Sequence, residues 1–433
     1  MNLPDTYTAY SYGYPHKSAY GPLRPAVPLG DVWAQEDQRR LFLYVHLPFC
    51  EMRCGFCNLF TESQPADDAV DAYLTALESQ SHVLRELLPD ARFARLALGG
   101  GTPTYLTAFQ LERLITLCSE VWNIQASGIP TSVETSPATA TEDRLKLLAD
   151  WGVRRISLGV QSFREEEVRG MGRPQDPRAV IETIERIQRH DFPVLNLDLI
   201  YGEPGQTVDT WLESIDQALA FQPAELFLYP LYIRPQTGLS RVGESPSDNR
   251  LTLYQEGRDR LLSAGYRQVS MRCFRRGDLV DNEGPAYCCQ SDGMLGLGCG
   301  ARSYTRRLHY ASRFAVSQSH VRAIVRDWSR QPTVAHAFAD HGFWLNADEQ
   351  RRRGLILSLL QVDGVDRREY TASFGVDPLE AFPQLADLID EGMASATADH
   401  VTLSASGLER SDAIGPWLYS EQTARALAEF NPP

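Results

Sequence analysis

The sequence has 433 residues, more than one ordinary domain needs, so at least two structural units are expected. It is 43% hydrophobic and 23% charged, as globular proteins are, and its formal net charge is -14. This negative charge argues against nucleic acid or a membrane surface as a partner, because phosphate binding needs a basic surface. No stretch approaches the roughly 20 apolar residues of a membrane span, and residues 1–20 lack the apolar centre of a signal peptide, so a cytoplasmic protein is expected.

The first half of the sequence alternates short apolar runs with amphipathic segments. Strands are predicted at residues 41–46, 94–98, 131–135, 154–160, 194–200 and 225–231. Helices are predicted between them at residues 68–88, 111–121, 143–148, 177–189 and 208–221. This alternation indicates parallel βαβ units and an α/β fold class, with a partial parallel barrel of six βα units. Such a barrel carries its chemistry at the C-terminal ends of its strands.

Four segments are expected along the chain. Residues 1–40 are rich in tyrosine and form an N-terminal arm, which acts either as a lid over the barrel mouth or as a packing strap. Residues 41–235 form the barrel, and residues 236–335 form a small α/β extension with a GLGxGA turn. Residues 336–433 form a helical module that resembles a winged helix, in which Asn346 and Glu349 fit a capping box.

Three of the eight cysteines directly follow the first predicted strand, as Cys50, Cys54 and Cys57 in a C-x3-C-x2-C pattern. Three thiolates at this spacing can hold a [4Fe–4S] cluster and leave its fourth iron without a protein ligand. The amino and carboxylate groups of S-adenosylmethionine (SAM) can chelate that iron, and a reduced cluster can then cleave SAM to a 5′-deoxyadenosyl radical. Inert buried cysteines are an alternative, and so is a zinc site, although zinc prefers a fourth ligand.

Glycines and polar residues at the ends of the later strands are candidates for binding SAM. The glycines at 99–101 allow a ligand to approach the backbone, where free amides can bind its amino and carboxylate groups. Polar residues in apolar strands need partners, which a nucleoside with a charged methionine tail would supply. These polar residues are Glu134, Gln161, Arg173 and Asp198. Helix capping and mutual pairing remain the alternatives, and His46 is expected to orient the cysteine loop.

Five motifs together resemble those of one known family. They are YVHLPFC (44–50), GGGTPTYL (99–106), RISLGVQSF (155–163), NLDLIYGEPGQT (196–207) and GMLGLGCGARSY (293–304). The combination is similar to the oxygen-independent coproporphyrinogen III oxidase family of radical SAM proteins. The resemblance runs from about residue 41 into the C-terminal module.

This resemblance implies a cluster on the three cysteines of the loop and two adjacent SAM molecules. The first SAM would contact Tyr44, Phe56, Gly100 and Glu134. The second SAM would lie near Gln161, Arg173, Asp198, Gly101 and Thr102, with Tyr232, Ala301 and Arg302 closing its site. A low-potential electron donor and a small-molecule substrate are the implied partners.

Two departures from the family pattern bear on the reaction. The oxidases carry another cysteine two residues after the last ligand, where this sequence has Leu59, which argues against porphyrinogen decarboxylation. The haem-chaperone branch carries an H-N-x-x-Y-W element, where residues 287–292 here read YCCQSD. A third branch uses the second SAM as a methyl or methylene donor. We therefore expect methyl or methylene transfer to an unsaturated or aromatic substrate, with coproporphyrinogen-type oxidative decarboxylation and haem carriage as alternatives.

Two clusters of residues in the extension bear on the substrate. Eight arginines can bind carboxylates of a substrate through bidentate pairs, or can balance nearby acids on a solvated surface. They are Arg267, Arg272, Arg275, Arg276, Arg302, Arg306, Arg307 and Arg313. Four further cysteines, Cys273, Cys288, Cys289 and Cys299, can hold an auxiliary cluster or a substrate thioether, although their spacing matches no established pattern.

Overall fold

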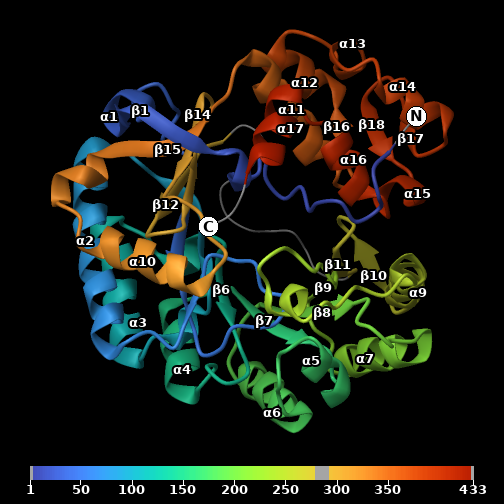
Figure 1. Cartoon of the computed structure of the whole chain (residues 1–433), viewed down its shortest axis with the longest axis horizontal. Coiled ribbons are helices and arrows are strands. Elements are labelled where there is room, and N and C mark those ends of the chain that lie inside the picture. The colour runs from blue at the N-terminus through green and yellow to red at the C-terminus, as the bar shows by residue number, and fades with distance from the viewer. Residues whose placement is uncertain (1–2, 278–291, 431–433) are drawn as a thin grey trace.

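The computed structural model describes residues 3–277 and 292–430, in which strands of a curved sheet are surrounded by helices (Figure 1). The six predicted strands are all present, as β2 (Leu41–Leu47), β5 (Phe93–Gly100), β6 (Thr131–Thr135), β7 (Arg155–Gln161), β8 (Val194–Tyr201) and β9 (Glu225–Pro230). They are neighbours in this order, and every pair is parallel. The predicted α/β class and partial parallel barrel are therefore confirmed.

The helices between these strands start where the sequence supplies caps. They are α2 (Asp67–Leu87), α3 (Ala108–Thr116), α4 (Glu142–Trp151), α5 (Glu165–Gly170), α6 (Pro177–Gln188) and α7 (Val208–Ala220). Thr107 and Gln110 form a capping box at α3, because each side chain accepts a hydrogen bond from the backbone of the other. The predicted helix at 111–121 continues past α3 as a wider turn, Leu117–Val121.

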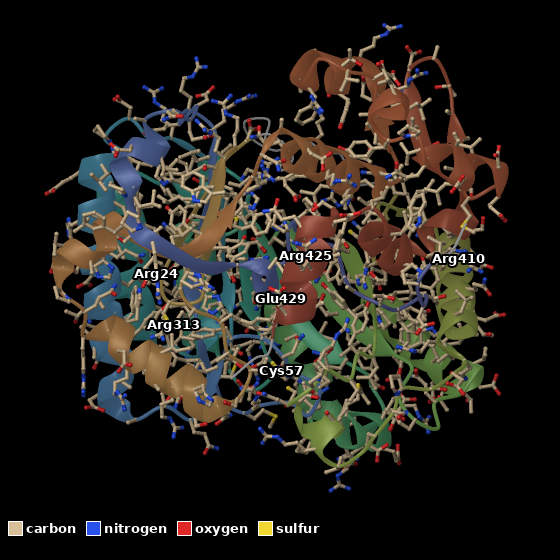
Figure 2. All side chains as sticks on the ribbon, turned by 45° about the horizontal axis from the view of Figure 1, so that its top comes forward. Arg24, Cys57, Arg313, Arg410, Arg425 and Glu429 are labelled. Atoms are coloured by element: carbon tan, nitrogen blue, oxygen red, sulfur yellow. The ribbon has the colours of Figure 1, made fainter. Side chains whose placement is uncertain are left out.

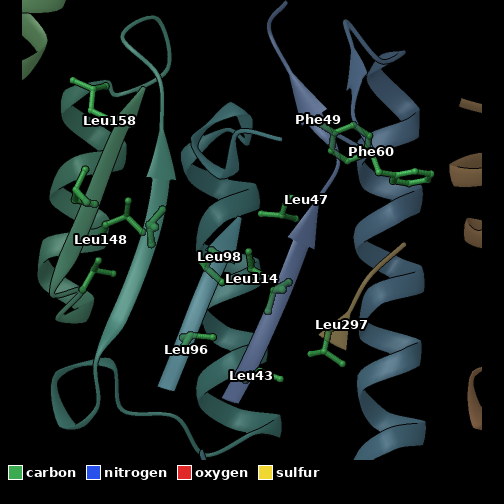
Figure 3. Packing of buried hydrophobic residues seen from close by; sticks show 14 of the residues in the cluster. Leu43, Leu47, Phe49, Phe60, Leu96, Leu98, Leu114, Leu148, Leu158 and Leu297 are labelled. Carbon is green, nitrogen blue, oxygen red and sulfur yellow. The ribbon is translucent and has the colours of Figure 1, made fainter. Parts of the chain in front are cut away.

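Residues on each barrel strand alternate between the helices outside and the interior. On β2, Leu41, Leu43, Val45 and Leu47 are fully buried, and Figure 3 shows leucines of β2 and β5 packed beside Leu114 of α3. The intervening positions are less apolar, with Tyr44 and His46 on β2, Arg155 and Ser157 on β7, and Asn196 and Asp198 on β8. Because successive side chains of a strand point to opposite faces, this alternation places the polar groups inside the barrel.

The sheet continues past both edges of the six barrel strands to a total of 13 strands in the described residues. On one side β12 (Met294–Leu297) lies parallel to β2, followed by β13 (Arg302–Tyr304), β14 (Leu308–Ala311), β15 (Phe338–Trp344) and β1 (Gly21–Pro28). On the other side β11 (Cys273–Arg276) and β10 (Tyr266–Gln268) follow β9. The extension therefore shares the barrel's sheet, and its helices include α8 (Gly238–Arg241), α9 (Arg250–Ser263) and α10 (Gln318–Ser329).

The N-terminal arm contributes both an edge strand and a cover for part of the barrel. Its strand β1 pairs with β15, and α1 (Leu29–Trp33) follows. Upstream, the ring of Tyr7 lies 6.3 Å from that of Tyr201 at the end of β8. The ring of Tyr10 lies 6.3 Å from that of Tyr229 near the end of β9. The tyrosines therefore lie over the C-terminal ends of these strands, where the lid was expected.

The C-terminal residues form a module with its own small sheet and apolar core. Its sheet has the order β16 (Val365–Asp366), β18 (His400–Leu403), β17 (Ala394–Ala396). Its helices are α11 (Ala347–Leu359), α12 (Arg367–Phe374), α13 (Pro378–Ala381), α14 (Leu385–Asp390), α15 (Ala405–Leu408), α16 (Ser411–Trp417) and α17 (Glu421–Glu429). A helix, a strand, further helices and then two strands are the arrangement expected of a winged-helix-like unit.

The expected capping box of this module forms only in part. The side chain of Asn346 accepts a hydrogen bond from the backbone of Glu349, so the N-cap is confirmed. The Glu349 carboxylate instead faces inward and accepts hydrogen bonds from Tyr14, Ser420 and Thr423. Tyr14 thereby fastens the N-terminal arm to the module. No helix in the described part of the chain is long and apolar enough to cross a membrane.

Candidate active site

The loop that carries the three cysteines leaves the barrel directly after β2. It starts with the short strand β3 (Phe49–Cys50), which pairs with β4 (Glu62–Ser63) and so closes the loop at its base. The amide of Cys57 donates a hydrogen bond to the carbonyl of Cys54 at 3.1 Å. The guanidinium of Arg53 donates to the carbonyls of Cys57 and Thr61, each at 3.3 Å. These bonds shape the loop without using the sulfur atoms.

The glycines at the end of β5 hold the cysteine loop against the barrel. The amide of Gly101 donates to the carbonyl of Leu47 at 2.8 Å, and that of Thr102 to the carbonyl of Phe49 at 2.7 Å. The Thr102 hydroxyl also donates to the sulfur of Cys50 at 3.6 Å. The amide of Gly100 donates to the Glu134 carboxylate at 3.1 Å. The expectation of free amides for SAM was therefore wrong at these three positions, because the protein itself uses them.

Gly101 tolerates no side chain, which yields a testable prediction. A β-carbon built there would lie 2.5 Å from the carbonyl oxygen of Phe49 and 3.0 Å from the sulfur of Cys50. We expect Gly101→Ala to displace the cysteine loop and lower the iron and sulfide content after anaerobic reconstitution. Gly128→Ala is the matched control, since its nearest neighbour would lie 3.9 Å away. Equal iron content in both variants would contradict this role of Gly101.

His46 bridges the interior of the barrel and the cysteine loop, as expected of a residue that orients the loop. Its Nε2 pairs with the carbonyl oxygen of Phe60 at 3.0 Å, and its Nδ1 lies 3.3 Å from the Tyr44 hydroxyl. Burial lowers the pKa of His46 to about 4, so the ring is neutral at physiological pH. A neutral imidazole adds no positive charge of its own next to Tyr44 and acts on the loop through its hydrogen bond to Phe60.

Arg173, Gln161 and Cys54 come together on the far side of the cysteine loop. Arg173 donates to the sulfur of Cys54 at 3.0 Å and to the carbonyl of Gly159 at 3.2 Å. The register of β7 and β8 shifts between Gly159 and Gln161, and Gln161 has a φ of 68°. A glutamine rarely adopts this left-handed conformation, and such strain clusters at ligand-binding sites.

Two carboxyl groups face each other across the barrel interior. Burial raises the pKa of Glu134 to about 7, and the nearby Asp198 raises it further while the Gly100 amide lowers it. Burial also raises the pKa of Asp198, which accepts hydrogen bonds from Ser157 at 3.2 Å and Asn196 at 2.8 Å. The sequence analysis missed Ser157 and Asn196, although the alternation along β7 and β8 would have placed them on the same face. A Glu134 carboxyl with a pKa of about 7 can accept or donate hydrogen bonds to a nucleoside.

Four further predicted SAM residues lie elsewhere around the site. Phe56 packs against an apolar cluster with Met171 and Leu239. The hydroxyl of Tyr232 donates to Asp412 and accepts from Arg272 at 3.0 Å. Ala301 is buried in the turn before β13, and Arg302 lies against the rings of Tyr12 and Tyr304. Their predicted roles toward SAM stay predictions.

Three of the eight arginines of the extension pair with protein acids within the described residues. Arg272 pairs with Asp412 at 2.5 Å, Arg275 with Glu225 at 2.7 Å and Arg306 with Glu36 at 3.5 Å. These three charges already have counter-ions, so the eight arginines do not form one common site for substrate carboxylates. Arg302 and Arg313 are among those that form no ion pair within the described residues.

The additional cysteines form no recognisable ligand set in the described residues. Cys273 is buried on β11, and Cys299 is buried beside Ser312, with a distance of 3.6 Å between the sulfur and the hydroxyl. Cys288 and Cys289 lie outside the described residues, as does most of the YCCQSD segment. An auxiliary cluster thus stays an untested prediction.

The residues around the cysteine loop fit a cluster with SAM. In the described residues, no three His, Cys, Asp or Glu side chains gather tightly enough for a single ion. A cubane needs a looser arrangement, with one thiolate on each of three irons. The sulfurs of Cys50 and Cys54 each accept a hydrogen bond, from Thr102 and Arg173, as the sulfurs of metal-bound cysteines commonly do. Cys50, Cys54 and Cys57 therefore stay the predicted ligands of a cluster.

Comparison with known proteins agrees with this geometry. Residues 44–218 match the Radical SAM superfamily, and residues 345–409 match the HemN C-terminal domain. A heme chaperone HemW from Lactococcus lactis is 30% identical over 62% of this chain and 70% of its own length. An oxygen-independent coproporphyrinogen III oxidase from Paracoccus denitrificans is 29% identical over 84% of this chain and 82% of its own length.

The same architecture is present in a solved structure. Coproporphyrinogen III oxidase (HemN) from Escherichia coli superposes with a TM-score of 0.78 and 24% identity. The match covers 94% of this chain and 96% of that chain. At this identity the match establishes the fold, from the barrel to the C-terminal module, and leaves the reaction to be argued from the site.

Proposed function

Since the chain belongs to the HemN-like family of radical SAM enzymes, we propose that it uses SAM to abstract hydrogen from a small, carboxylate-bearing substrate. Membership of this family implies a [4Fe–4S] cluster and SAM, and Cys50, Cys54 and Cys57 would hold that cluster. When bound, the cluster and SAM supply a 5′-deoxyadenosyl radical. The main supporting observation is that the amides of Gly101 and Thr102, just after β5, hydrogen-bond the start of the cysteine loop. They hold the loop at the same end of the barrel as Glu134 and Gln161.

Two SAM molecules are part of this proposal. Tyr44, Gly100 and Glu134 lie on β2, β5 and β6, on one side of the cysteine loop. Gln161, Arg173 and Asp198 lie on or after β7 and β8, on the other side, where Arg173 contacts Cys54. Each set contains a carboxyl with a raised pKa, which can bond to ribose hydroxyls or an amino group. The strained Gln161 supports a ligand on the second side.

The residues of this chain have three tasks in such a reaction. The backbone bonds of Gly101 and Thr102 fix the cysteine loop, and with it the position of the reacting sulfonium. Glu134 and Asp198 orient the nucleoside through hydrogen bonds. Tyr7 and Tyr10 of the arm cover the ends of β8 and β9, which excludes water from a site where a radical must survive.

Oxidative decarboxylation is the first candidate for the overall reaction. The relatives named above include coproporphyrinogen III oxidases, and the names of the curated relatives give no support to the methyl transfer favoured by the sequence analysis. Methyl or methylene transfer stays the second candidate because Leu59 stands where the oxidases have their additional cysteine. Leu59 is 47% exposed.

Product analysis of the reconstituted enzyme tests the proposal. The protein is loaded anaerobically with iron and sulfide, reduced, and given methyl-labelled SAM and coproporphyrinogen III. 5′-Deoxyadenosine with carbon dioxide supports decarboxylation, while S-adenosylhomocysteine with label in the product supports methyl transfer. Stoichiometric haem binding without SAM consumption would favour a haem-binding function over an enzymatic one, in line with the name heme chaperone of the HemW relatives. SAM left intact under all conditions would overturn the proposal.

A further inference from the structure

Lys17 and Arg302 line one small pocket beside the cysteine loop. Lys17 lies in the short turn η1 (Lys17–Ala19) of the N-terminal arm, and Arg302 begins β13. The pocket is also lined by Arg313, and none of its lining residues is acidic. Phe60, three residues after the last cysteine of the loop, forms part of its wall. Figure 2 shows Arg313 and Cys57 on the face of the molecule that also carries the C-terminal helix.

The two cations lack acidic partners in the part of the chain that the structure describes. The ammonium of Lys17 stands 3.8 Å from the ring centre of Phe314. The guanidinium of Arg302 lies 4.7 Å from the ring of Tyr12, and its Nη1 is buried without a hydrogen-bond partner. Burial and then the charge of Arg302 lower the pKa of Lys17 to about 7. Buried like charges are costly unless an anion compensates them.

The choice of lysine at this position is unusual for this chain. Of its 42 basic residues only Lys17 and Lys146 are lysines. Lys146 lies on the exposed helix α4 and pairs with Asp150 at 2.6 Å. A lysine supplies a compact charge on a flexible stem, and an arginine supplies a planar fork, so the two together can surround both oxygens of one carboxylate.

We propose that Lys17 and Arg302 bind one carboxylate group of the substrate beside the cysteine loop. This inference deepens the proposed function and depends on it for the class of substrate. The pocket is too small for a whole substrate, so only a terminal group could enter it. A β-carbon built on Gly300, which lines the pocket, would lie 2.7 Å from the Nε2 of His46, so the pocket borders the barrel interior. A carboxylate held here would extend the rest of its molecule toward that interior.

The methionine part of SAM also carries a carboxylate and is the other source of such a group. Of the residues implied for the second SAM, Arg302 lines this pocket, whereas Gln161, Arg173 and Asp198 do not. In the sheet, the four strands β12, β2, β5 and β6 lie between β13 and β7, and β8 is one strand further away. The sheet order therefore favours a carboxylate of the substrate.

Competitive acetylation of the two lysines tests this inference on the reconstituted holoprotein. The anaerobic protein is treated with an amine-acetylating reagent, and mass spectrometry compares Lys17 with Lys146 as the internal control. Propionate and coproporphyrin III should each slow the acetylation of Lys17. At a ligand concentration of twice that ligand's Kd the rate should fall about threefold, and the acetylation rate of Lys146 should not change. The tetramethyl ester of coproporphyrin III, which has no carboxylate, should not protect.

The other possible results of the acetylation experiment have distinct meanings for the pocket and for the proposed function. Protection by propionate without protection by coproporphyrin III keeps the pocket and removes porphyrins from the proposed function. Protection by SAM, with none by propionate or coproporphyrin III, assigns the pocket to SAM and overturns the inference. No protection by any of the three overturns it as well. In Arg302→Gln the protection by propionate should be lost while the absorption of the cluster is retained, which separates loss of the pocket from loss of the fold.

Discussion

Cys54→Ala is expected to abolish both the stable four-iron cluster and reductive cleavage of SAM. Cys54 is one of the three cysteines of the loop, and the other cysteines of the described residues, Cys118, Cys273 and Cys299, belong to other segments of the chain. Loss of a residue that merely supports a metal ligand typically costs 10–100-fold, so loss of a ligand itself should lower cleavage by more than about 100-fold. Iron and sulfide analysis with measurement of 5′-deoxyadenosine checks this expectation.

A second buried cysteine provides the control for this substitution. Cys118 lies in the turn after α3, inside the main apolar core and away from the loop. Cys118→Ala should therefore retain a full complement of iron and sulfide and normal SAM cleavage. A four-iron cluster with normal cleavage in Cys54→Ala would refute the assignment of the ligands, whatever the substrate is.

The parts of the fold that local sequence encodes were predicted well. The short apolar run at 41–46 located β2, and similar runs located the five other strands, because such runs are a local property of the sequence. Glu134 and Asp198 were selected as candidates because they are polar residues within such apolar strands. The strand β12 was not predicted, because its four residues include a glycine and become a strand only through pairing with β2.

The contacts that complete the site depend on residues far apart in the sequence. The pairing of Arg272 with Asp412 spans 140 residues, and Lys17 of the N-terminal arm lines one pocket with Arg302 of β13. Neither pairing leaves a pattern within one segment. The single local signal was the rarity of lysine in this chain, which was visible in the sequence but was not used. The hydrogen bond from the Gly101 amide to Leu47 was also not predicted. A run of glycines allows a close approach of another backbone segment as readily as that of a ligand, so the sequence does not distinguish the two.

Asp412→Ala is expected to destabilise the protein more than any surface substitution. The Arg272 and Asp412 side chains are 3% and 1% exposed, and their pairing at 2.5 Å joins the barrel sheet to α16 of the C-terminal module. Tyr232 donates to the same carboxylate, and the ring of Tyr10 lies 3.8 Å from the Arg272 guanidinium. Removal of the carboxylate leaves a buried, uncompensated cation, which typically costs about 3–5 kcal/mol. Urea denaturation of the reconstituted protein measures the loss.

An exposed ion pair of the same module is the matched control. Arg368 and Asp399 pair at 2.7 Å with side chains 82% and 53% exposed, so Asp399→Ala should cost less than about 1 kcal/mol. Arg272→Met combined with Asp412→Leu should recover much of the loss, because it removes both charges and retains the packed volume. Similar small losses for both alanine variants would contradict the view that this pair is the main polar link between module and barrel. Because the guanidinium also contacts Tyr10, Asp412→Ala should in addition expose the N-terminal arm to proteolysis at lower urea concentrations than Asp399→Ala.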